Sequence, residues 1–211
     1  NVDFAYSCNS GTSALHLAFL AINLNHYDSI IIPGINFIAS ANIASQMKAK
    51  IFFSDVDPMT GQLTPELIKE CISKNKIKNL KAIVTMYHGG FLRNIKKMNS
   101  LKKKLGCFLI EDACHALGSS YKSKGKINSK IGSCEYADIS TFSLHPLKSI
   151  TSGEGGIVTT KKKFLAEKIR LFRSHGIVRK KNHYIYDVKL NGFNYRLSDI
   201  NCALAYSQLR K

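Results

Sequence analysis

The feature that most constrains the fold is an alternation of short β-rich runs with longer helical patterns along the chain. Strands are expected at residues 29–32, 51–53, 82–86, 107–111, 139–142 and 156–159. Helices are expected at residues 13–21, 38–47, 65–73, 95–105, 163–174 and 198–208. Strands that alternate with helices form βαβ units, so the sequence predicts an α/β fold with a mostly parallel sheet and helices on both faces.

The chain is expected to form one domain over residues 1–211. Its 211 residues are 45% hydrophobic, which is enough for one sizeable core, and no repeat or flexible linker divides them. It opens at Asn1 without a methionine and stops at Lys211 directly after a helical pattern, so both ends are interpreted as cut. Residues 175–192 lose periodicity and become basic and aromatic, which predicts an excursion that is mobile or packed on a partner subunit.

The net charge of +17 is the extreme feature of the composition. Such a charge suits a polyanionic partner, and a basic nucleic-acid-binding protein is therefore the alternative from a different class. However, the lysines occur in short groups at 102–104, 161–163 and 179–181 without interleaved aromatic residues. We interpret them as a solvated surface and expect no nucleic-acid partner, although a positive field would also favour a nucleotide-linked substrate.

Membrane and metal partners are not expected either. The longest apolar stretch, residues 14–24, is interrupted by polar residues and is shorter than the ~20 residues of a membrane span. The six cysteines form no CxxC pair and no regular framework, so neither zinc nor a disulfide scaffold is indicated. Reduced cysteines agree with a reducing compartment, and the expected location is the cytoplasm.

The first segment that suits binding chemistry lies at residues 9–13, directly before an apolar helical pattern. Gly11 permits a tight turn, Thr12 or Ser13 can cap the helix, and the free backbone N–H groups at a helix start form an anion site. A phosphate could bind there. The alternative is an ordinary helix cap that binds nothing.

The second segment is the apolar run at residues 108–110, which ends in Glu111 and Asp112. The carboxyl ends of strands face the ligand crevice in an open α/β sheet, so Asp112 stands where a charge can act. It could bind a metal, serve as a base or pair with a protonated heterocycle. No spaced set of ligands accompanies it, which disfavours the metal. His115 could contribute to the site or be a hydrogen-bonded core residue.

The third segment is centred on Lys148, which follows the strand expected at 139–142 and is surrounded by small hydroxyl residues and glycines. A lysine becomes a nucleophile when its pKa is lowered, usually to form a Schiff base with a carbonyl compound. The alternative is a surface lysine in a loop. The glycines at 153, 155 and 156 are not a dinucleotide fingerprint, because a strand follows them rather than a helix.

Together these segments resemble the DegT/StrS family of sugar aminotransferases. The family's motifs read close to GTSALHLA, EDAAHALG and FSFHPxKxITTGEGG, and this chain has GTSALHLA at 11–18, EDACHALG at 111–118 and FSLHPLKSITSGEGG at 142–156, in the same order. Leu144 replaces the usual second Phe and Ser152 the usual Thr. FRSHG at 172–176 and GFNYRLSD at 192–199 extend the resemblance toward the end of the chain.

The resemblance implies the large domain of a type I fold that binds pyridoxal 5'-phosphate (PLP) and works as a homodimer. In this family Lys148 would bind the cofactor covalently, Asp112 would bind the pyridine nitrogen, and His115 would lie on the ring's phenolic side. Phe37 matches the aromatic that stacks on the ring, and Asn194 a residue that reaches the neighbouring subunit's cofactor phosphate. With the phosphate contacts, the expected cofactor-binding residues are Gly11, Thr12, Ser13, Phe37, Asp112, His115, Ser143, Lys148 and Asn194.

The resemblance also implies a substrate class. HPLK at 145–148 and LFRSHGI at 171–177 look most like the UDP-4-amino-4,6-dideoxy-N-acetyl-altrosamine transaminases of pseudaminic acid biosynthesis, which use glutamate to aminate a 4-keto-6-deoxy nucleotide sugar. Another 3-keto or 4-keto sugar linked to dTDP or GDP is the alternative. Lys148 disfavours a dehydratase, in which histidine usually replaces the lysine. Complete members also have a carboxy-terminal small domain, which we expect to be absent here, so the fragment is expected to be weakly active or inactive.

Overall fold

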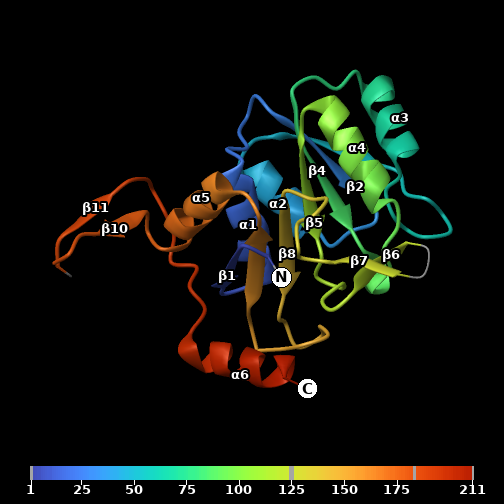
Figure 1. The fold of residues 1–211 in the computed structure, drawn as a ribbon. Helices are drawn as coiled ribbons and strands as arrows, with labels where there is room; N and C mark the ends of the chain where they lie inside the picture. Colours follow the sequence, from blue (N-terminus) through green and yellow to red (C-terminus); the bar gives the residue numbers. More distant parts are fainter. Residues whose placement is uncertain (1, 124–125, 183, 211) are drawn as a thin grey trace.

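A computed structural model, drawn in Figure 1, describes residues 2–123, 126–182 and 184–210. In these residues a seven-stranded sheet forms the centre of the molecule. Its strands, in spatial order, are β1 (Phe4–Cys8), β9 (Gly156–Thr160), β8 (Ile139–Ser143), β5 (Phe108–Asp112), β4 (Leu80–Met86), β2 (Ser29–Pro33) and β3 (Lys50–Ser54). The five strands from β3 to β8 in this order are parallel, whereas β9 is antiparallel to both β8 and β1.

Helices cover both faces of this sheet. They are α1 (Gly11–Ala21), α2 (Ala39–Gln46), α3 (Pro65–Asn75), α4 (Ile95–Leu105) and α5 (Lys163–Arg173). Helix α6 (Asp199–Leu209) instead lies beyond the carboxyl ends of the strands (Figure 1). Ile30 and Ile32 of β2 pack with α1, α2 and α5 in one core cluster, whereas Ile31 packs with α3 and α4 in another. Since successive side chains of a strand point to opposite faces, the two clusters lie on opposite faces of the sheet. The predicted α/β class, with helices on both faces, is confirmed.

The elements follow from local sequence. The run from Ser29 to Pro33 is buried at every position, which is typical of a parallel strand covered on both faces. Helix α3 begins with Thr64 as its N-cap, followed by Pro65, and ends at Lys76 in the left-handed conformation. All twelve predicted elements are present, and their ends agree within about two residues, the usual uncertainty of helix and strand ends.

Five strands were not expected from the sequence. β1 is short and lies at the edge of the sheet, and β6 (Ser120–Ser123) and β7 (Lys126–Lys130) form a small hairpin of mostly polar residues. The other two, β10 (Ile177–Arg179) and β11 (Tyr186–Val188), lie within the expected excursion. None of these runs shows a clear apolar alternation, which is the main sequence signal for a strand.

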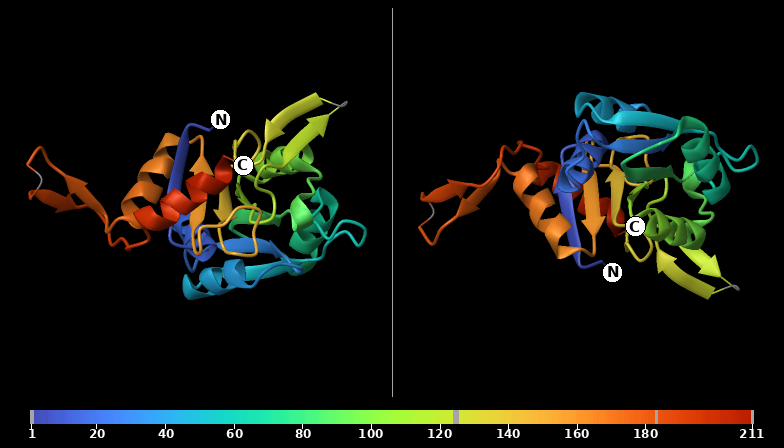
Figure 2. Two further views of the ribbon diagram at one scale, coloured as in Figure 1. Left: turned by 90° about the horizontal axis from the view of Figure 1, so that it is seen from below. Right: turned by 90° about the horizontal axis from the view of Figure 1, so that it is seen from above.

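The β10–β11 hairpin extends away from the rest of the molecule in all three views of Figures 1 and 2. The two strands pair with each other and not with the central sheet. Tyr184 is 92% exposed and Val188 is 60% exposed, so apolar surface faces outward. The expected excursion is present, and its packing on a partner subunit stays a prediction.

Two negative findings apply to the described part of the chain. None of its helices is long and apolar enough to cross a membrane. It also contains no group of three or more His, Cys, Asp or Glu residues arranged to hold a metal ion.

Candidate active site

The candidate site lies at the carboxyl edge of the sheet, where β2, β4, β5 and β8 all end because they are parallel. β1 ends at the same edge and leads directly into α1. The loop between β8 and β9 contains Lys148 and is held by α6, since Asn201 Nδ2 donates to the backbone oxygens of Ser152 at 2.5 Å and Glu154 at 3.0 Å.

The amino end of α1 presents free backbone donors at this edge. Ser10 is the N-cap, and its Oγ accepts the Ser13 N–H at 3.0 Å. The expectation that Thr12 or Ser13 caps the helix is therefore wrong: the helix begins earlier, and both residues lie within its first turn. The N–H groups of Gly11 and Thr12 have no acceptor among the described residues, so they are available to an anion.

Glycines bring these donors close to the end of β8. A Cβ on Gly11 would lie 2.8 Å from the Cβ of Ser143, and a Cβ on Gly156 would lie 2.2 Å from the backbone oxygen of Ser10. Only glycine permits such close approaches. The structure therefore brings the free N–H groups of α1 beside Ser143, whose Oγ accepts the His145 N–H at 3.3 Å and keeps its own proton to donate.

Asp112 and Lys148 are the acidic and the basic side chain of the site. Asp112 is 3% exposed at the end of β5, and the Cys114 N–H donates to its Oδ1 at 3.3 Å. Burial raises the pKa of Asp112, and the hydrogen bonds from Cys114 and the charges of Lys148 and His115 act in the opposite direction. Among the described residues no ion pair joins Asp112 to Lys148. The two groups are thus near enough to interact electrostatically but are not in direct contact.

Two histidines lie beside this pair. His115 is exposed as a whole residue, but its ring is partly shielded from water. This partial burial is the largest cause that lowers the pKa of His115, and the charges of Lys148 and His88 lower it further, so the ring is neutral near pH 7. His88 was not predicted from the sequence; it lies in the short 3₁₀ helix η1 (His88–Gly90), with its ring centroid 6.1 Å from that of His115. Its position just after β4 could have predicted it, because residues at the carboxyl ends of parallel strands face the ligand crevice, as Asp112 does at the end of β5.

Phe37 lies in the loop after β2 and is 70% exposed. With Thr12 and Ser13 it lines a pocket of about 340 Å³ between α1 and α2. His16 and Tyr195 close one side of this pocket, joined by a hydrogen bond of 3.0 Å between His16 Nδ1 and the Tyr195 hydroxyl. Phe37 is therefore brought to the same end of α1 as the predicted phosphate contacts.

Asn194 is the predicted residue that the structure does not join to the others. Its side chain is exposed and makes no hydrogen bond within the described part of the chain, although its backbone pairs with Ser174. The next residue, Tyr195, accepts the Asn9 N–H at 2.9 Å and links this segment to the start of α1.

The arrangement suits a ligand with an anionic end and a ring nitrogen that gains a proton. Free N–H groups and hydroxyls at α1 fit a phosphate, a buried carboxylate fits a protonated heterocycle, and a half-buried lysine fits an aldehyde. The fold and this edge of the sheet place the chain in the class of type I PLP-dependent transferases.

Comparison with known proteins identifies the family. The chain belongs to the DegT/DnrJ/EryC1/StrS aminotransferase family, whose sequence pattern matches residues 1–211. It is 42% identical over 210 residues to a UDP-4-amino-4,6-dideoxy-N-acetyl-beta-L-altrosamine transaminase of Campylobacter jejuni, covering 100% of this chain and 53% of the relative. The chain spans about half the length of the relatives it matches.

Solved structures agree with this assignment. The chain matches Helicobacter pylori PseC, an aminotransferase involved in pseudoaminic acid biosynthesis, with a TM-score of 0.87 and 34% identity, covering 100% of this chain and 54% of that one. It matches an aminotransferase from Psychrobacter cryohalolentis with a TM-score of 0.89 and 28% identity, covering 99% of this chain and 52% of that one.

Proposed function

We propose that the whole protein transfers an amino group from glutamate to a 4-keto-6-deoxy sugar linked to a nucleotide, with PLP as cofactor. The observation that carries the proposal is that buried Asp112 lies at the same edge of the sheet as the free N–H groups of α1, Ser143 and the loop that contains Lys148. The 42% identity to the C. jejuni altrosamine transaminase supports a UDP-linked substrate. Another 3-keto or 4-keto sugar is the alternative, because a GDP-perosamine synthase of Caulobacter vibrioides is 34% identical.

Each predicted residue has a role in this proposal. Gly11, Thr12, Ser13 and Ser143 hold the phosphate, Phe37 stacks on the ring, and His115 lies at the ring's phenolic oxygen. Asn194 reaches the phosphate bound by a second copy of the chain, so the proposal includes a homodimer. The described cysteines are all free, in agreement with the cytoplasm as the location.

Two side chains perform the acid–base chemistry. When bound, PLP supplies an aldehyde that captures amino groups and a ring that accepts electrons from the bond being broken. The carboxylate of Asp112 accepts a hydrogen bond from the ring nitrogen and keeps the proton there. The amine of Lys148 would hold the aldehyde and, as a free amine, would accept and return a proton at the substrate carbon.

The test is covalent labelling of the chain by its cofactor. PLP is added, the absorbance near the visible region is recorded, borohydride is used to reduce the adduct, and mass spectrometry locates the modified residue. We expect the label on Lys148, and we expect Lys148→Ala to abolish both label and transamination. Lys163→Ala on the exposed start of α5 is the matched control and should behave like the wild type.

Two outcomes would count against the proposal. Transamination retained by Lys148→Ala would remove the assignment of that lysine. DNA affinity that falls steeply with salt, in a protein that gives no cofactor absorbance, would favour a nucleic-acid-binding protein instead.

A further inference from the structure

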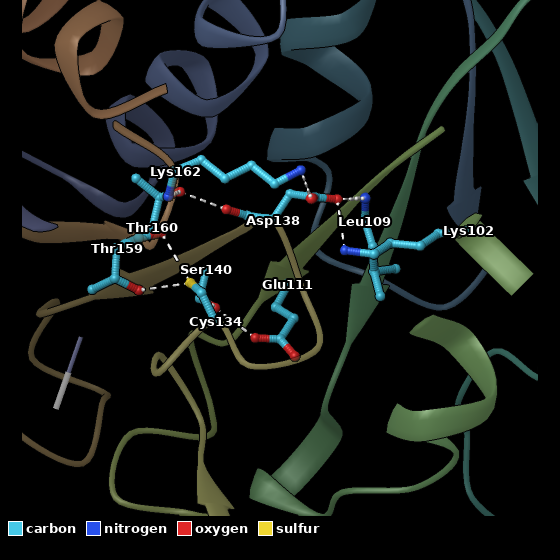
Figure 3. Close-up of polar contacts among 9 residues, drawn as sticks. All are labelled: Lys102, Leu109, Glu111, Cys134, Asp138, Ser140, Thr159, Thr160 and Lys162. Carbon is cyan, nitrogen blue, oxygen red and sulfur yellow. Dashed lines mark hydrogen bonds and ion pairs between the residues drawn. The ribbon is translucent and has the colours of Figure 1, made fainter. Parts of the chain in front are cut away.

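Glu111 precedes Asp112 on β5, and its side chain therefore points to the opposite face of the sheet. It is 3% exposed, and both of its carboxylate oxygens accept a hydrogen bond. The Tyr87 hydroxyl donates to Oε1 at 3.0 Å, and the Ser140 hydroxyl donates to Oε2 at 2.5 Å. Figure 3 shows Glu111 pointing toward Ser140 of the neighbouring strand β8.

These contacts belong to a polar row that crosses the sheet. Glu111 is paired with Ser140, and Ser140 is paired with Thr159 of β9. The thiol of Cys134 lies 3.4 Å from the Ser140 hydroxyl and 3.2 Å from the Thr159 backbone oxygen (Figure 3). The row therefore links the end of β5 to the first half of β8 and to β9, and Tyr87, directly after β4, joins it from the other side.

Glu111 is the carboxylate of this row, and a buried carboxylate is costly unless it is hydrogen-bonded. Glu111 therefore stays close to the donors on the neighbouring strands. Burial raises the pKa of Glu111, and its hydrogen bonds with Ser140 and Tyr87 act in the opposite direction. Burial and the nearby Glu111 also raise the pKa of Tyr87 well above its usual range, so its hydroxyl stays a donor. Both donors are themselves buried, with Ser140 at 0% and Tyr87 at 3% exposed, so water cannot replace them.

Asp112, by contrast, has little side-chain support of its own. The backbone N–H and the thiol of Cys114 are the hydrogen-bond donors that the described residues offer to its carboxylate, the N–H at 3.3 Å. The backbone on either side of it is bonded to Thr141, whose Oγ1 donates to the Glu111 backbone oxygen at 3.2 Å and whose own backbone oxygen accepts the Ala113 N–H at 2.9 Å. The place of the Asp112 carboxylate is thus determined by where the end of β5 lies.

We propose that Glu111 is a positioning residue for the site: through Ser140 and Tyr87 it fastens the end of β5 from the opposite face of the sheet and so holds Asp112 in place. The inference rests on the proposed function, because the role of Asp112 is to bind the cofactor nitrogen. Loss of Glu111 leaves Asp112 present but poorly placed.

The same pair of strands contains a matched control. Asp138, 2% exposed and directly before β8, lies near the amino ends of the strands. It accepts the Leu109 N–H of β5 at 2.8 Å and forms ion pairs with Lys102 at 3.0 Å and Lys162 at 2.6 Å (Figure 3). It is also a buried carboxylate that joins β5 to β8, but it is at the edge opposite the site.

The experiment compares Glu111→Ala, Glu111→Gln and Asp138→Ala by melting temperature and by PLP dissociation constant. We expect both alanine variants to lower the melting temperature. Only Glu111→Ala should also weaken PLP binding, by about tenfold or more, which corresponds to a loss of ~1.4 kcal/mol in the contact between Asp112 and the cofactor. Glu111→Gln should restore affinity, because its amide oxygen accepts from Ser140 and its amide nitrogen donates to the Tyr87 oxygen. If Glu111→Ala does not fold, Tyr87→Phe is measured in its place, because it removes one of the two hydrogen bonds to Glu111.

Hydrogen exchange of the cofactor-free protein gives a readout that does not depend on PLP. Glu111→Ala should speed exchange at residues 110–114, whereas Asp138→Ala should speed it near residue 109. Equal losses of PLP affinity in Glu111→Ala and Asp138→Ala, or unchanged exchange at 110–114 in a folded Glu111→Ala variant, would overturn the inference. A wild-type chain that binds no PLP, with the expected exchange pattern, would instead contradict the proposed function.

Discussion

Asp112 shows how a single residue can reduce stability and still serve the site. Its carboxylate is buried without an ion-pair partner among the described residues, and burial raises its pKa. A carboxyl whose pKa is raised by folding holds its proton more tightly when folded, so folding stability is lost as pH rises above the ordinary range of Asp. Under the proposed function, a cationic ring nitrogen bound to Asp112 would offset this cost.

The first prediction concerns Asp112→Asn. In the cofactor-free protein at pH 7 we expect this variant to be at least as stable as the wild type, because it removes a buried charge. Its PLP affinity should fall about 10- to 100-fold, since a hydrogen bond to a charged group contributes about 1.5–3 kcal/mol. Urea unfolding and PLP titration measure the two effects.

The pH dependence of PLP affinity distinguishes loss of the Asp112 charge from a general loss of fit between the site and the cofactor. Wild-type PLP affinity should decrease as pH falls, beginning above the ordinary pKa of Asp, because the raised pKa of Asp112 protonates it early. Asp112→Asn should lack this acid-side decrease. The same decrease in both proteins would mean that another group titrates.

At the scale of elements, α6 and the β8–β9 loop form one unit. Asn201 on the first turn of α6 donates to two backbone oxygens of the loop, and Gln208 on its last turn accepts the Thr151 N–H at 3.4 Å. Because Lys148 is in this loop, a helix distant in sequence determines how firmly the lysine is held.

The second prediction follows from this contact. Asn201→Ala should raise hydrogen exchange across residues 144–156 and weaken PLP binding severalfold, because two hydrogen bonds worth about 1 kcal/mol each are lost. Gln208→Ala is the control and should have a smaller effect, since its bond is longer. Equal exchange in the Asn201 variant and the wild type would show that the loop is held by other contacts.

At the scale of the whole molecule, the β10–β11 hairpin exposes apolar side chains well away from the core. Besides Tyr184 and Val188, Ile185 is 50% exposed and Tyr186 is 52% exposed. Exposed apolar surface of this kind marks an interaction site, and the proposed homodimer offers a partner for it.

The third prediction is that the hairpin supports dimerisation. Replacing Tyr184 and Tyr186 by Ser should weaken the dimer at least tenfold, as measured by sedimentation velocity over a range of concentrations, because aromatic side chains dominate interface energies. Tyr27→Ser is the control, since Tyr27 is also exposed, at 72%, but lies on the body of the molecule. A dimer of unchanged affinity in the double variant would exclude the hairpin from the interface.

The sequence by itself determined the α/β class, the twelve main elements and the place of Asp112, because apolar periodicity and strand ends are local properties of the chain. Its motifs also indicated Lys148 and the start of α1. Only the tertiary structure decided that Ser10 rather than Thr12 or Ser13 caps α1, that His88 lies beside His115, and that Glu111 is held from the far face of β5. These facts depend on contacts between residues far apart along the chain or on the geometry of one turn, and neither the order nor the spacing of residues encodes them visibly.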